Sequence, residues 1–484
     1  MKKMNLLVMS LVSAAALSFT SCSSNDDLAG NAGQAKVDQF YMTLTIQTPN
    51  SNGTRTVVNK PTVDATAAES DVTSGTFYLV DANNKIVFKK SISKEEWAEK
   101  KIPTQGTNGK TTLQVPVENV TAGTKYSVYF LANSESASPL TDVYTSDLAN
   151  KFAKAYSTAN NFAMFNENDA DVKANSHTVV FTSDNKDANS AAKVSSIINI
   201  ERLTARIDEP KSEASVIKPY AVDATASDEE KKANADAVKA VKGVTLTKYA
   251  ISNVANKTNV MQQWADATTL SIPSDISYFQ PTSEFGTKTL LQNYGYFNAV
   301  TTEEGKEKRN DYVFENNSSD AATSMYFEYT VKLNKEYQDK ADIKDGTFYR
   351  YNKVIYSRIQ DIIDFYKDQK AIFDGKDAKT VVDELKAAKV DPDSEAKLDE
   401  FRKKYDIEVF NEGKTYYVQK IKDQYLGVEN TIQRNSIYLL NVKNIFNVGA
   451  QVPNGGPDDR TLYYLDVEVS VNPWVLNEQS VDFK

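Results

Sequence analysis

Residues 463–476 read YYLDVEVSVNPWVL, and this stretch carries the strongest strand pattern of the chain. Apolar and polar residues alternate along it, and a period of two places the apolar set on one face of a β-strand. A linker containing Pro and Gly, residues 451–460, separates it from the chain before it. Because its backbone groups and apolar face need partners, it pairs either within its own domain or with another molecule. The positions that would face the partner are Tyr463, Leu465, Val467, Val469, Val471, Trp474 and Leu476.

The body of the chain begins with the same alternation. Four apolar residues recur at every second position of residues 37–47 and predict a first strand with one buried face. They are Phe40, Met42, Leu44 and Ile46. Further strand patterns lie at residues 75–87 (with a turn at Asn83-Asn84), 113–117, 126–132, 178–182, 197–207, 244–254, 325–333, 415–418 and 437–442. The sequence therefore predicts a mainly β protein, with a domain boundary near residues 208–218.

Three intervals depart from the strand pattern. Residues 353–405 place apolar side chains at helical spacing, which predicts a helical excursion from a β domain. Its two apolar stripes are Ile355, Ile359, Ile362, Ile363 and Tyr366, and Val381, Val382, Leu385 and Ala388. Residues 227–241 begin with the cap-type Ser227 and acidic residues, and Gly243 follows their end, so we expect a short, solvated helix. Residues 148–165 are rich in Ala and aromatics, and we expect a helix there as well.

Composition excludes several classes of function. The chain has 484 residues, which suggests two or three domains, and its 65 acidic and 56 basic side chains give a net charge of −9. That sign argues against a nucleic-acid partner, which favours a basic face. The chain has a single His and a single Cys, so His177 is the only candidate base for a Ser-His-Asp site. A zinc site built from several His and Cys ligands is excluded. We therefore expect no enzyme, no cofactor and no metal site.

Some weaker possibilities stay open. A glycosidase needs only two carboxylates. Among 65 acidic residues some pair always looks suitable, so their presence is almost no evidence for glycosidase activity. Residues 166–171 cluster oxygen ligands that calcium could use, yet they lack the twelve-residue loop with its central Gly and terminal Glu. We expect a solvated loop there and a strand-edge position for His177. Core packing is expected for Trp97, Trp264 and Trp474 rather than stacking on sugars.

The N-terminus resembles an export signal. Lys2 and Lys3 precede an apolar run of residues 6–19, which is too short to span a bilayer but typical of a signal peptide. Small residues before Cys22 resemble a lipobox, in which that thiol is acylated and becomes the mature N-terminus. The alternative is an ordinary secretory signal with an incidental cysteine. We expect a signal peptide at residues 1–21 and a lipid-anchored, flexible tether at 22–36.

Several segments, taken in order, resemble the fimbrillins, the lipoprotein precursors that polymerise into type V pili of anaerobic Gram-negative bacteria. The layout is most similar to the short-fimbria branch of major subunits. The segments are Met42–Arg55, Tyr126–Ser134, Phe162–Glu167, Asn199–Ile207, Tyr312–Asn317, Met325–Leu333, Gln433–Ile445 and Leu462–Phe483, with Pro473-Trp474-Val475-Leu476 as a signature. The chain departs from the family at 134–159 and at the helical residues 353–405.

The resemblance implies two tandem transthyretin-like β-sandwich domains, residues 37–207 and 208–484, with the helical insertion 353–405 in the second. It implies export as an outer-membrane lipoprotein carrying palmitate on Cys22, with the membrane reached only through that lipid. A trypsin-like protease would cut between Arg55 and Thr56 and release the first strand, 37–47. The C-terminal strand of another subunit, residues 461–484, would fill the gap by donor-strand exchange, giving a surface fimbria that supports adhesion.

The partners implied are other copies of the chain, other fimbrial subunits, the protease, and host or bacterial surface ligands. An intact C-terminal strand suits a shaft subunit, which must both donate and accept. Two alternatives remain: a fimbrial tip or anchor subunit, and a surface β-sandwich lipoprotein that binds glycans.

Overall fold

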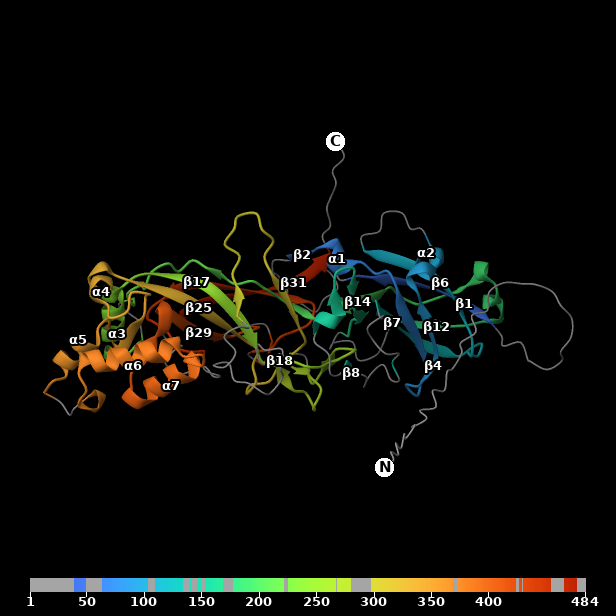
Figure 1. Cartoon of the computed structure of the whole chain (residues 1–484). Helices are drawn as coiled ribbons and strands as arrows, with labels where there is room; N and C mark the ends of the chain where they lie inside the picture. Colours follow the sequence, from blue (N-terminus) through green and yellow to red (C-terminus); the bar gives the residue numbers. More distant parts are fainter. Residues whose placement is uncertain are drawn as a thin grey trace, which may run out of the picture. The chain divides into compact units, whose positions relative to one another are not determined.

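The protein is represented by a computed structural model of the whole chain (Figure 1). It describes residues 39–48, 63–102, 109–133, 140, 147–148, 153–168, 177–221, 225–266, 268–279, 297–368, 372–423, 426–428, 430–453 and 465–476. Gln39–Lys484 form one compact unit, and Met1–Asp38 lie outside the described residues. The predicted mainly β fold is confirmed, because strands dominate the described elements. The division into two transthyretin-like sandwiches stays a prediction.

A ten-stranded sheet holds the first strand of the chain in its interior. Its strand order is β4-β3-β7-β11-β14-β1-β6-β5, with β12 beside β7 and β13 beside β1. The bounds are β1 Phe40–Gln47, β3 Gly75–Val80, β4 Ile86–Ile92, β5 Lys101–Ile102, β6 Lys110–Val117, β7 Lys125–Ala132, β11 Met164–Asn166, β12 Thr178–Val180, β13 Ala192–Lys193 and β14 Ile198–Arg202. The expected turn between β3 and β4 is confirmed, with Asn84 in the left-handed region at φ 63°.

Two further sheets contain the longest strands of the second half of the chain. A six-stranded sheet has the order β2-β31-β30-β15-β24, with β16 beside β30, and a four-stranded sheet has the order β23-β17-β25-β29. The bounds are β2 Val63–Ala65, β15 Ala205–Asp208, β16 Lys211–Ser212, β24 Asn310–Val313, β30 Ser436–Ile445, β31 Leu465–Leu476, β17 Val241–Ser252, β23 Asn298–Ala299, β25 Ser324–Leu333 and β29 Lys414–Lys420. Residues of both sheets share one large apolar core.

Short strands and helices complete the described elements. Pairs form between β8 Asp147–Leu148 and β19 Thr258–Asn259, β9 Ser157–Thr158 and β10 Asn161–Phe162, β18 Val254–Ala255 and β22 Tyr278–Phe279, and β20 Gln263–Trp264 and β21 Leu270–Ser271. The helices are α1 Ala67–Ser70, α2 Lys94–Lys100, α3 Asp228–Ala240, α4 Lys335–Lys340, α5 Ile359–Phe365, α6 Ala378–Val390 and α7 Ser394–Tyr405. Within the described ranges, no helix combines the length and apolarity that crossing a membrane requires.

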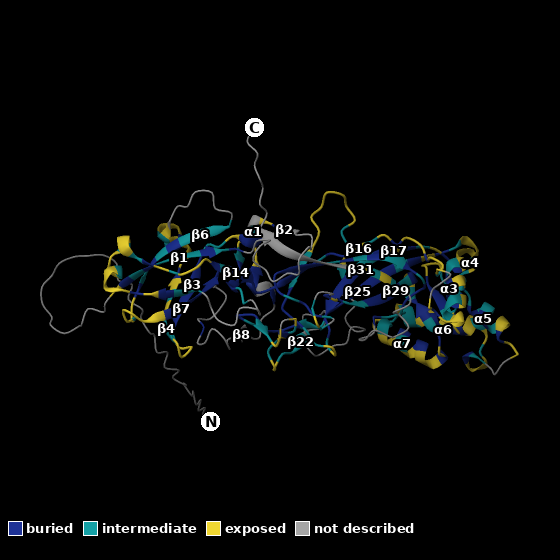
Figure 2. Cartoon of the chain, turned by 180° about the vertical axis from the view of Figure 1, so that it is seen from behind, coloured by how far each residue is buried: buried dark blue, intermediate teal, exposed yellow. Residues whose placement is uncertain are grey.

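The helical excursion at 353–405 has its own apolar core. Helices α5, α6 and α7 lie beside the small sheet of β26 Phe348–Tyr351, β27 Val354–Tyr356 and β28 Glu408–Phe410 (Figure 1). Both predicted stripes point inward, with Ile362 and Leu385 fully buried. Only Ile355 differs, because it lies on β27 and packs in the large core instead. Figure 2 shows buried positions following the sheets and exposed positions gathering on loops and on these helices.

Two helix predictions need correction. Residues 153–165 contain one 3-10 turn, Ala153–Tyr156, followed by the short strands β9, β10 and β11, so the helix expected at 148–165 is wrong there. Its aromatic residues pack in sheet cores, and that tertiary packing outweighs the helix propensity of its alanines. The helix at 227–241 exists, capped by Ser227, but it is not a solvated insertion, since Ala233, Ala237 and Ala240 are buried.

Candidate functional site

The strand predicted to be removable, β1, lies between two neighbours. On one edge it is antiparallel to β6 over its whole length, from Phe40↔Val117 to Gln47↔Lys110. On the other edge it is parallel to β13 and β14, with the pairs Met42↔Ala192 and Ile46↔Ile198. Taking β1 out would therefore leave the β6 edge and the β13/β14 edge facing a gap one strand wide. We call this gap the β1 slot.

The inner face of β1 is the one that the sequence predicts. Phe40, Met42, Leu44 and Ile46 are at most 3% exposed, whereas the alternate residues are half-buried. The Phe40 ring lies 5.5 Å from the ring of Phe181, and the four side chains pack with β6 and β14 residues in one apolar core. Burial of such side chains is worth about 1.5–3 kcal/mol each, so an empty β1 slot would expose a strongly apolar surface.

The C-terminal strand, β31, lies in its own chain in this state. It is antiparallel to β30, from Ile445↔Leu465 to Ser436↔Pro473, and its last residues are parallel to β2, with Val63↔Trp474 and Ala65↔Leu476 (Figure 1). Of the two kinds of partner left open by the sequence, the structure has β31 paired within its own chain. Among the described residues, no strand pairs with the second edge of residues 465–473, so most of β31 is an edge strand.

Several predicted positions can be placed and others cannot. Leu465 and Val467 are half-buried against the core while Asp466 and Glu468 are exposed, which agrees with the predicted alternation. The backbone of Val469, Val471, Trp474 and Leu476 belongs to β31, and their side chains are outside what the structure describes. Cys22, Arg55, Thr56 and Tyr463 lie outside the described residues. In the sequence, Arg55 and Thr56 fall between the end of β1 and the start of β2.

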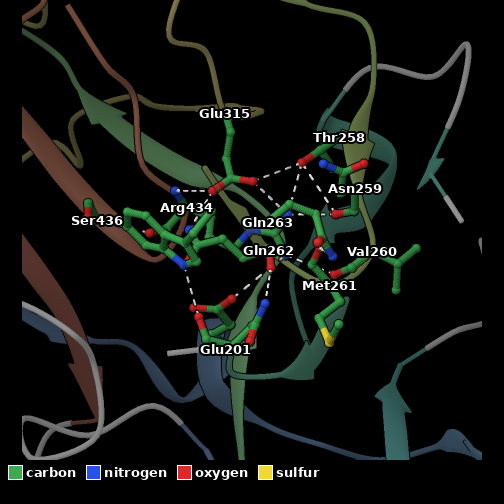
Figure 3. A network of polar contacts seen from close by, with 12 residues as sticks. Glu201, Thr258, Asn259, Val260, Met261, Gln262, Gln263, Glu315, Arg434 and Ser436 are labelled. Atoms are coloured by element: carbon green, nitrogen blue, oxygen red, sulfur yellow. Dashed lines mark hydrogen bonds and ion pairs between the residues drawn. The ribbon is translucent and has the colours of Figure 1, made fainter. Parts of the chain in front are cut away.

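A buried polar cluster, which we call the Arg434 network, lies just before β30 (Figure 3). The Arg434 guanidinium donates to Glu315 Oε2 at 2.7 Å, to Asn259 O at 2.6 Å and to Val260 O at 2.9 Å. Glu201, on β14, lies 3.8 Å away on the other side of the guanidinium, which is too far for a hydrogen bond. Its Oε1 atom has no hydrogen-bond partner among the described residues.

The two carboxyl groups beside Arg434 therefore differ in character. Complete burial raises the pKa of Glu201 well above its ordinary value, and the charge of Arg434 only partly opposes this effect. Glu315 receives a direct charge-assisted hydrogen bond from Arg434 and another from Gln262 Nε2 at 2.6 Å. We take Glu315, which accepts the hydrogen bond of Arg434, as the counterion of Arg434, whereas Glu201 on β14 lies farther from the guanidinium.

A second buried cluster fixes the segment that follows β2. Glu69 on α1 accepts from Arg206 Nη1 at 3.0 Å and from the Tyr312 hydroxyl at 3.0 Å. Arg202 donates from Nε to the Glu69 carbonyl oxygen at 2.8 Å and from Nη2 to Ser70 Oγ at 2.9 Å. Burial by itself would raise the pKa of Glu69, but the Thr66 N–H, the charge of Arg206 and the Tyr312 hydroxyl together leave that pKa below its ordinary value.

Of the catalytic and metal positions considered from the sequence, Asn166 and His177 have structural partners, and residues 169–171 lie outside the described residues. Asn166 accepts from the Phe130 N–H at 2.7 Å and donates to Val128 O, so its amide joins strands within the sheet. His177 precedes β12, its Nδ1 lies 2.8 Å from Ser196 Oγ, and burial lowers its pKa. No group of three or more His, Cys, Asp or Glu side chains in the described ranges could bind a metal ion.

Two of the tryptophans can be placed. Trp97 is buried, with its ring 5.9 Å from that of Phe130, as expected for core packing. Trp264 is half-buried and donates from its indole N–H to Asn168 O at 3.0 Å.

Both charged clusters were missed in the sequence. The signal was available in residues 199–207, NIERLTARI, where Glu201, Arg202 and Arg206 interrupt an apolar strand pattern. Charges at positions where a strand is expected to be buried indicate paired partners from elsewhere in the chain. The identity of those partners, Glu69, Glu315 and Arg434, comes from contacts between residues more than a hundred positions apart.

Comparisons with known proteins give one family match. Residues 408–480 match the family "Major fimbrial subunit protein type IV, Fimbrillin, C-terminal". No curated protein matches the chain.

Among solved structures, the chain is similar to two candidate cell adhesion proteins of Parabacteroides distasonis. One has 11% identity, a TM-score of 0.45 and coverage of 90% of this chain and 98% of that one. The other has 12% identity, a TM-score of 0.42 and coverage of 90% and 100%. The chain is also similar to the fimbrial anchor protein Mfa2 of Porphyromonas gingivalis, with 9% identity, a TM-score of 0.26 and coverage of 60% and 78%. Because these TM-scores are below 0.5, the likeness to fimbrillins rests on the family match at residues 408–480.

Proposed function

The protein is fimbrillin-like, with the C-terminal segment of that family at residues 408–480, and from this premise we propose that it is a structural subunit of a cell-surface fimbria that polymerises by protease-triggered donor-strand exchange. The β31 strand of one subunit enters the β1 slot of the next. The joint is heterologous and need not close on itself, so its repetition gives an open filament.

The observation that carries this proposal is the unequal pairing of the two strands. β1 has paired neighbours on both edges, whereas residues 465–473 of β31 pair only with β30 among the described residues. A β31 strand that leaves its own chain gives up the β30 ladder and the three-residue pairing with β2, and in the slot it gains a ladder on each edge. Alternate side chains of β31 then occupy the positions of Phe40, Met42, Leu44 and Ile46, which supplies register as well as affinity.

Proteolysis opens the slot. β1 and the segment beginning at β2 are connected by residues 48–62, and a cut after Arg55 separates them. A trypsin-like protease is suited to that position, which follows Ser-Asn-Gly-Thr. The released fragment carries β1 together with Cys22 and its lipid, so the same cut frees the subunit from the outer membrane.

A reversible lock on β31 tests the exchange. Asn441 on β30 and Glu468 on β31 are directly paired positions, at a separation that a disulfide can span. In a Cys22→Ser background, Asn441→Cys with Glu468→Cys should give monomers after trypsin treatment when oxidised and filaments when reduced, seen by electron microscopy. The single variant Asn441→Cys is the control and should form filaments in both states. Filaments from the oxidised double variant at the wild-type rate would contradict donor-strand exchange.

A further inference from the structure

The short strand β2 is the second neighbour of β31, and it covers the part of β31 farthest along the chain. Val63, Asp64 and Ala65 pair with Trp474, Val475 and Leu476. Among the described residues, these three positions extend beyond the β30 ladder, which ends at Pro473. Among the described strand pairings, β2 is therefore the neighbour that holds the last residues of β31 in the sheet.

β2 is in turn fixed by the residues that follow it, through polar contacts that include no residue of β1. The Glu69 carboxylate pairs with Arg206, and the Glu69 carbonyl accepts from Arg202. Ala68 O accepts from the Asn160 N–H at 2.6 Å. These partners lie on β14, β15 and the turn before β10, and although β14 is also a neighbour of β1, it pairs with β1 at Ile198 and Asn199 and not at Arg202. Loss of β1 thus removes none of the contacts of residues 66–70 named here.

From this arrangement we propose that residues 63–70 form an autoinhibitory clasp, in which Glu69 anchors β2 to the sheet and β2 retains the end of β31 on its own chain. This proposal rests on the proposed function, because it concerns the strand that the subunit would donate. The clasp lies after Arg55 in the sequence, so it stays with the subunit when the fragment carrying β1 is released. A cut subunit then keeps its donor strand covered until a neighbouring slot competes for it.

The anchor suits this role because its charge is buried. Glu69 is 4% exposed, and its carboxylate receives the Thr66 N–H at 2.8 Å besides Arg206 and Tyr312. Charge-assisted hydrogen bonds at a buried site are stronger than neutral ones. The Thr66 hydroxyl also donates to this carboxylate, at 3.1 Å. Since four groups from three parts of the chain converge on it, removing its charge should loosen α1 and β2 together.

Arg206 provides a matched control, because it pairs with two carboxylates. Its Nε lies 2.6 Å from Asp208 Oδ1, and its Nη2 lies 3.1 Å from Asp208 Oδ2. In Glu69→Gln the guanidinium keeps Asp208, and in Asp208→Asn it keeps Glu69. Each variant removes one carboxylate charge that pairs with Arg206, but only Glu69→Gln should weaken the clasp.

Hydrogen exchange on the uncut precursor with Cys22→Ser tests the clasp without any polymerisation. In Glu69→Gln, amides of residues 63–70 and 474–476 should exchange about tenfold faster or more, while those of β17 and β25 keep their wild-type rates and report an intact fold. Asp208→Asn should leave residues 474–476 near the wild-type rate. Unchanged exchange of 474–476 in Glu69→Gln, or equal acceleration in both variants, would overturn the clasp.

A second variant removes β2 as a strand while leaving Glu69 in place. Replacing Val63, Asp64 and Ala65 by glycine should accelerate exchange at residues 474–476 and leave residues 68–70 protected. Protection of 474–476 at the wild-type level in this variant would also refute the clasp. Since both readouts come from the precursor alone, a failure of filament formation would count against the proposed function and not against the clasp.

Discussion

At the scale of single residues, the geometry of the Arg434 network predicts that its two glutamates differ in how much they contribute to the free energy of unfolding. Glu315 is the hydrogen-bonded counterion of Arg434, whereas Glu201 has a raised pKa and no hydrogen bond to it. Glu315→Gln leaves a buried guanidinium without its near carboxylate and should lower the free energy of unfolding by about 3–5 kcal/mol. In Glu201→Gln a neutral amide replaces a carboxyl group whose pKa is raised by burial, so this variant should be no less stable than the wild type at neutral pH. Urea denaturation of the Cys22→Ser precursor at neutral pH compares the two, and equal losses would contradict these roles.

The pH dependence of stability separates two carboxyl groups at the same scale. The pKa of Glu69 is lowered in the folded chain, so its contribution is present above its ordinary value of 4.5 and is lost as the pH falls through the folded pKa. The pKa of Glu201 is raised, so above 4.5 the unfolded chain loses a proton that the folded chain keeps, and stability falls as the pH rises.

Thermal melts of the wild type and of Glu201→Gln from pH 4 to pH 8 test this difference. The two proteins should melt at similar temperatures near pH 4. As the pH increases, the melting temperature of the variant should rise relative to that of the wild type, because glutamine at position 201 does not titrate when the chain unfolds. Parallel curves over the whole range would show that Glu201 titrates normally in the fold.

At the scale of elements, the β1 slot predicts competition by a free peptide. A peptide of residues 37–47 carries the four side chains that fill the slot, and its backbone matches both flanking edges. Added in excess to freshly cut subunits, it should slow filament growth, measured by light scattering. The same peptide with Leu44→Glu places a charge where Leu44 is 1% exposed and should inhibit at least about tenfold less. Equal inhibition by the two peptides would argue against a slot that binds alternate apolar side chains of the incoming strand.

At the scale of the whole molecule, strand donation depends on the C-terminal residues 461–484, and release from the membrane depends on cleavage after Arg55. The two steps can therefore be blocked separately. Deleting residues 461–484 should leave subunits that are cut but remain soluble monomers, because the slot is open and no strand is available to fill it. Arg55→Ala should leave a precursor that stays uncut and lipid-anchored, measured by the mass of the protein extracted from the cell surface. Normal filaments from the deletion variant would refute donation by the C-terminal strand.

Much of this organisation follows from local patterns in the sequence. The alternation of Phe40, Met42, Leu44 and Ile46 predicts their burial, and the helical spacing around Ile362 and Leu385 predicts the inner faces of α5 and α6. These predictions succeed because side-chain direction repeats with a fixed period along a strand or a helix, whatever the partner is. The interval around Phe162 fails because its alanines and aromatics carry no strand period: β9 and β10 form a short local hairpin, and β11 is a strand only through its pairing with the distant β7 and β14.

The sequence by itself determined long strands such as β1, β25 and β30, which of their faces are apolar, and that the chain resembles fimbrillins. Only the tertiary structure decided that β1 is paired on both edges, that β31 is an edge strand resting on β30, and that Glu69 and Arg434 lie buried among partners from remote parts of the chain. Strand pairing and charge pairing depend on which distant segments come together. That choice is made by the free energy of the whole packed chain, and no local period records it.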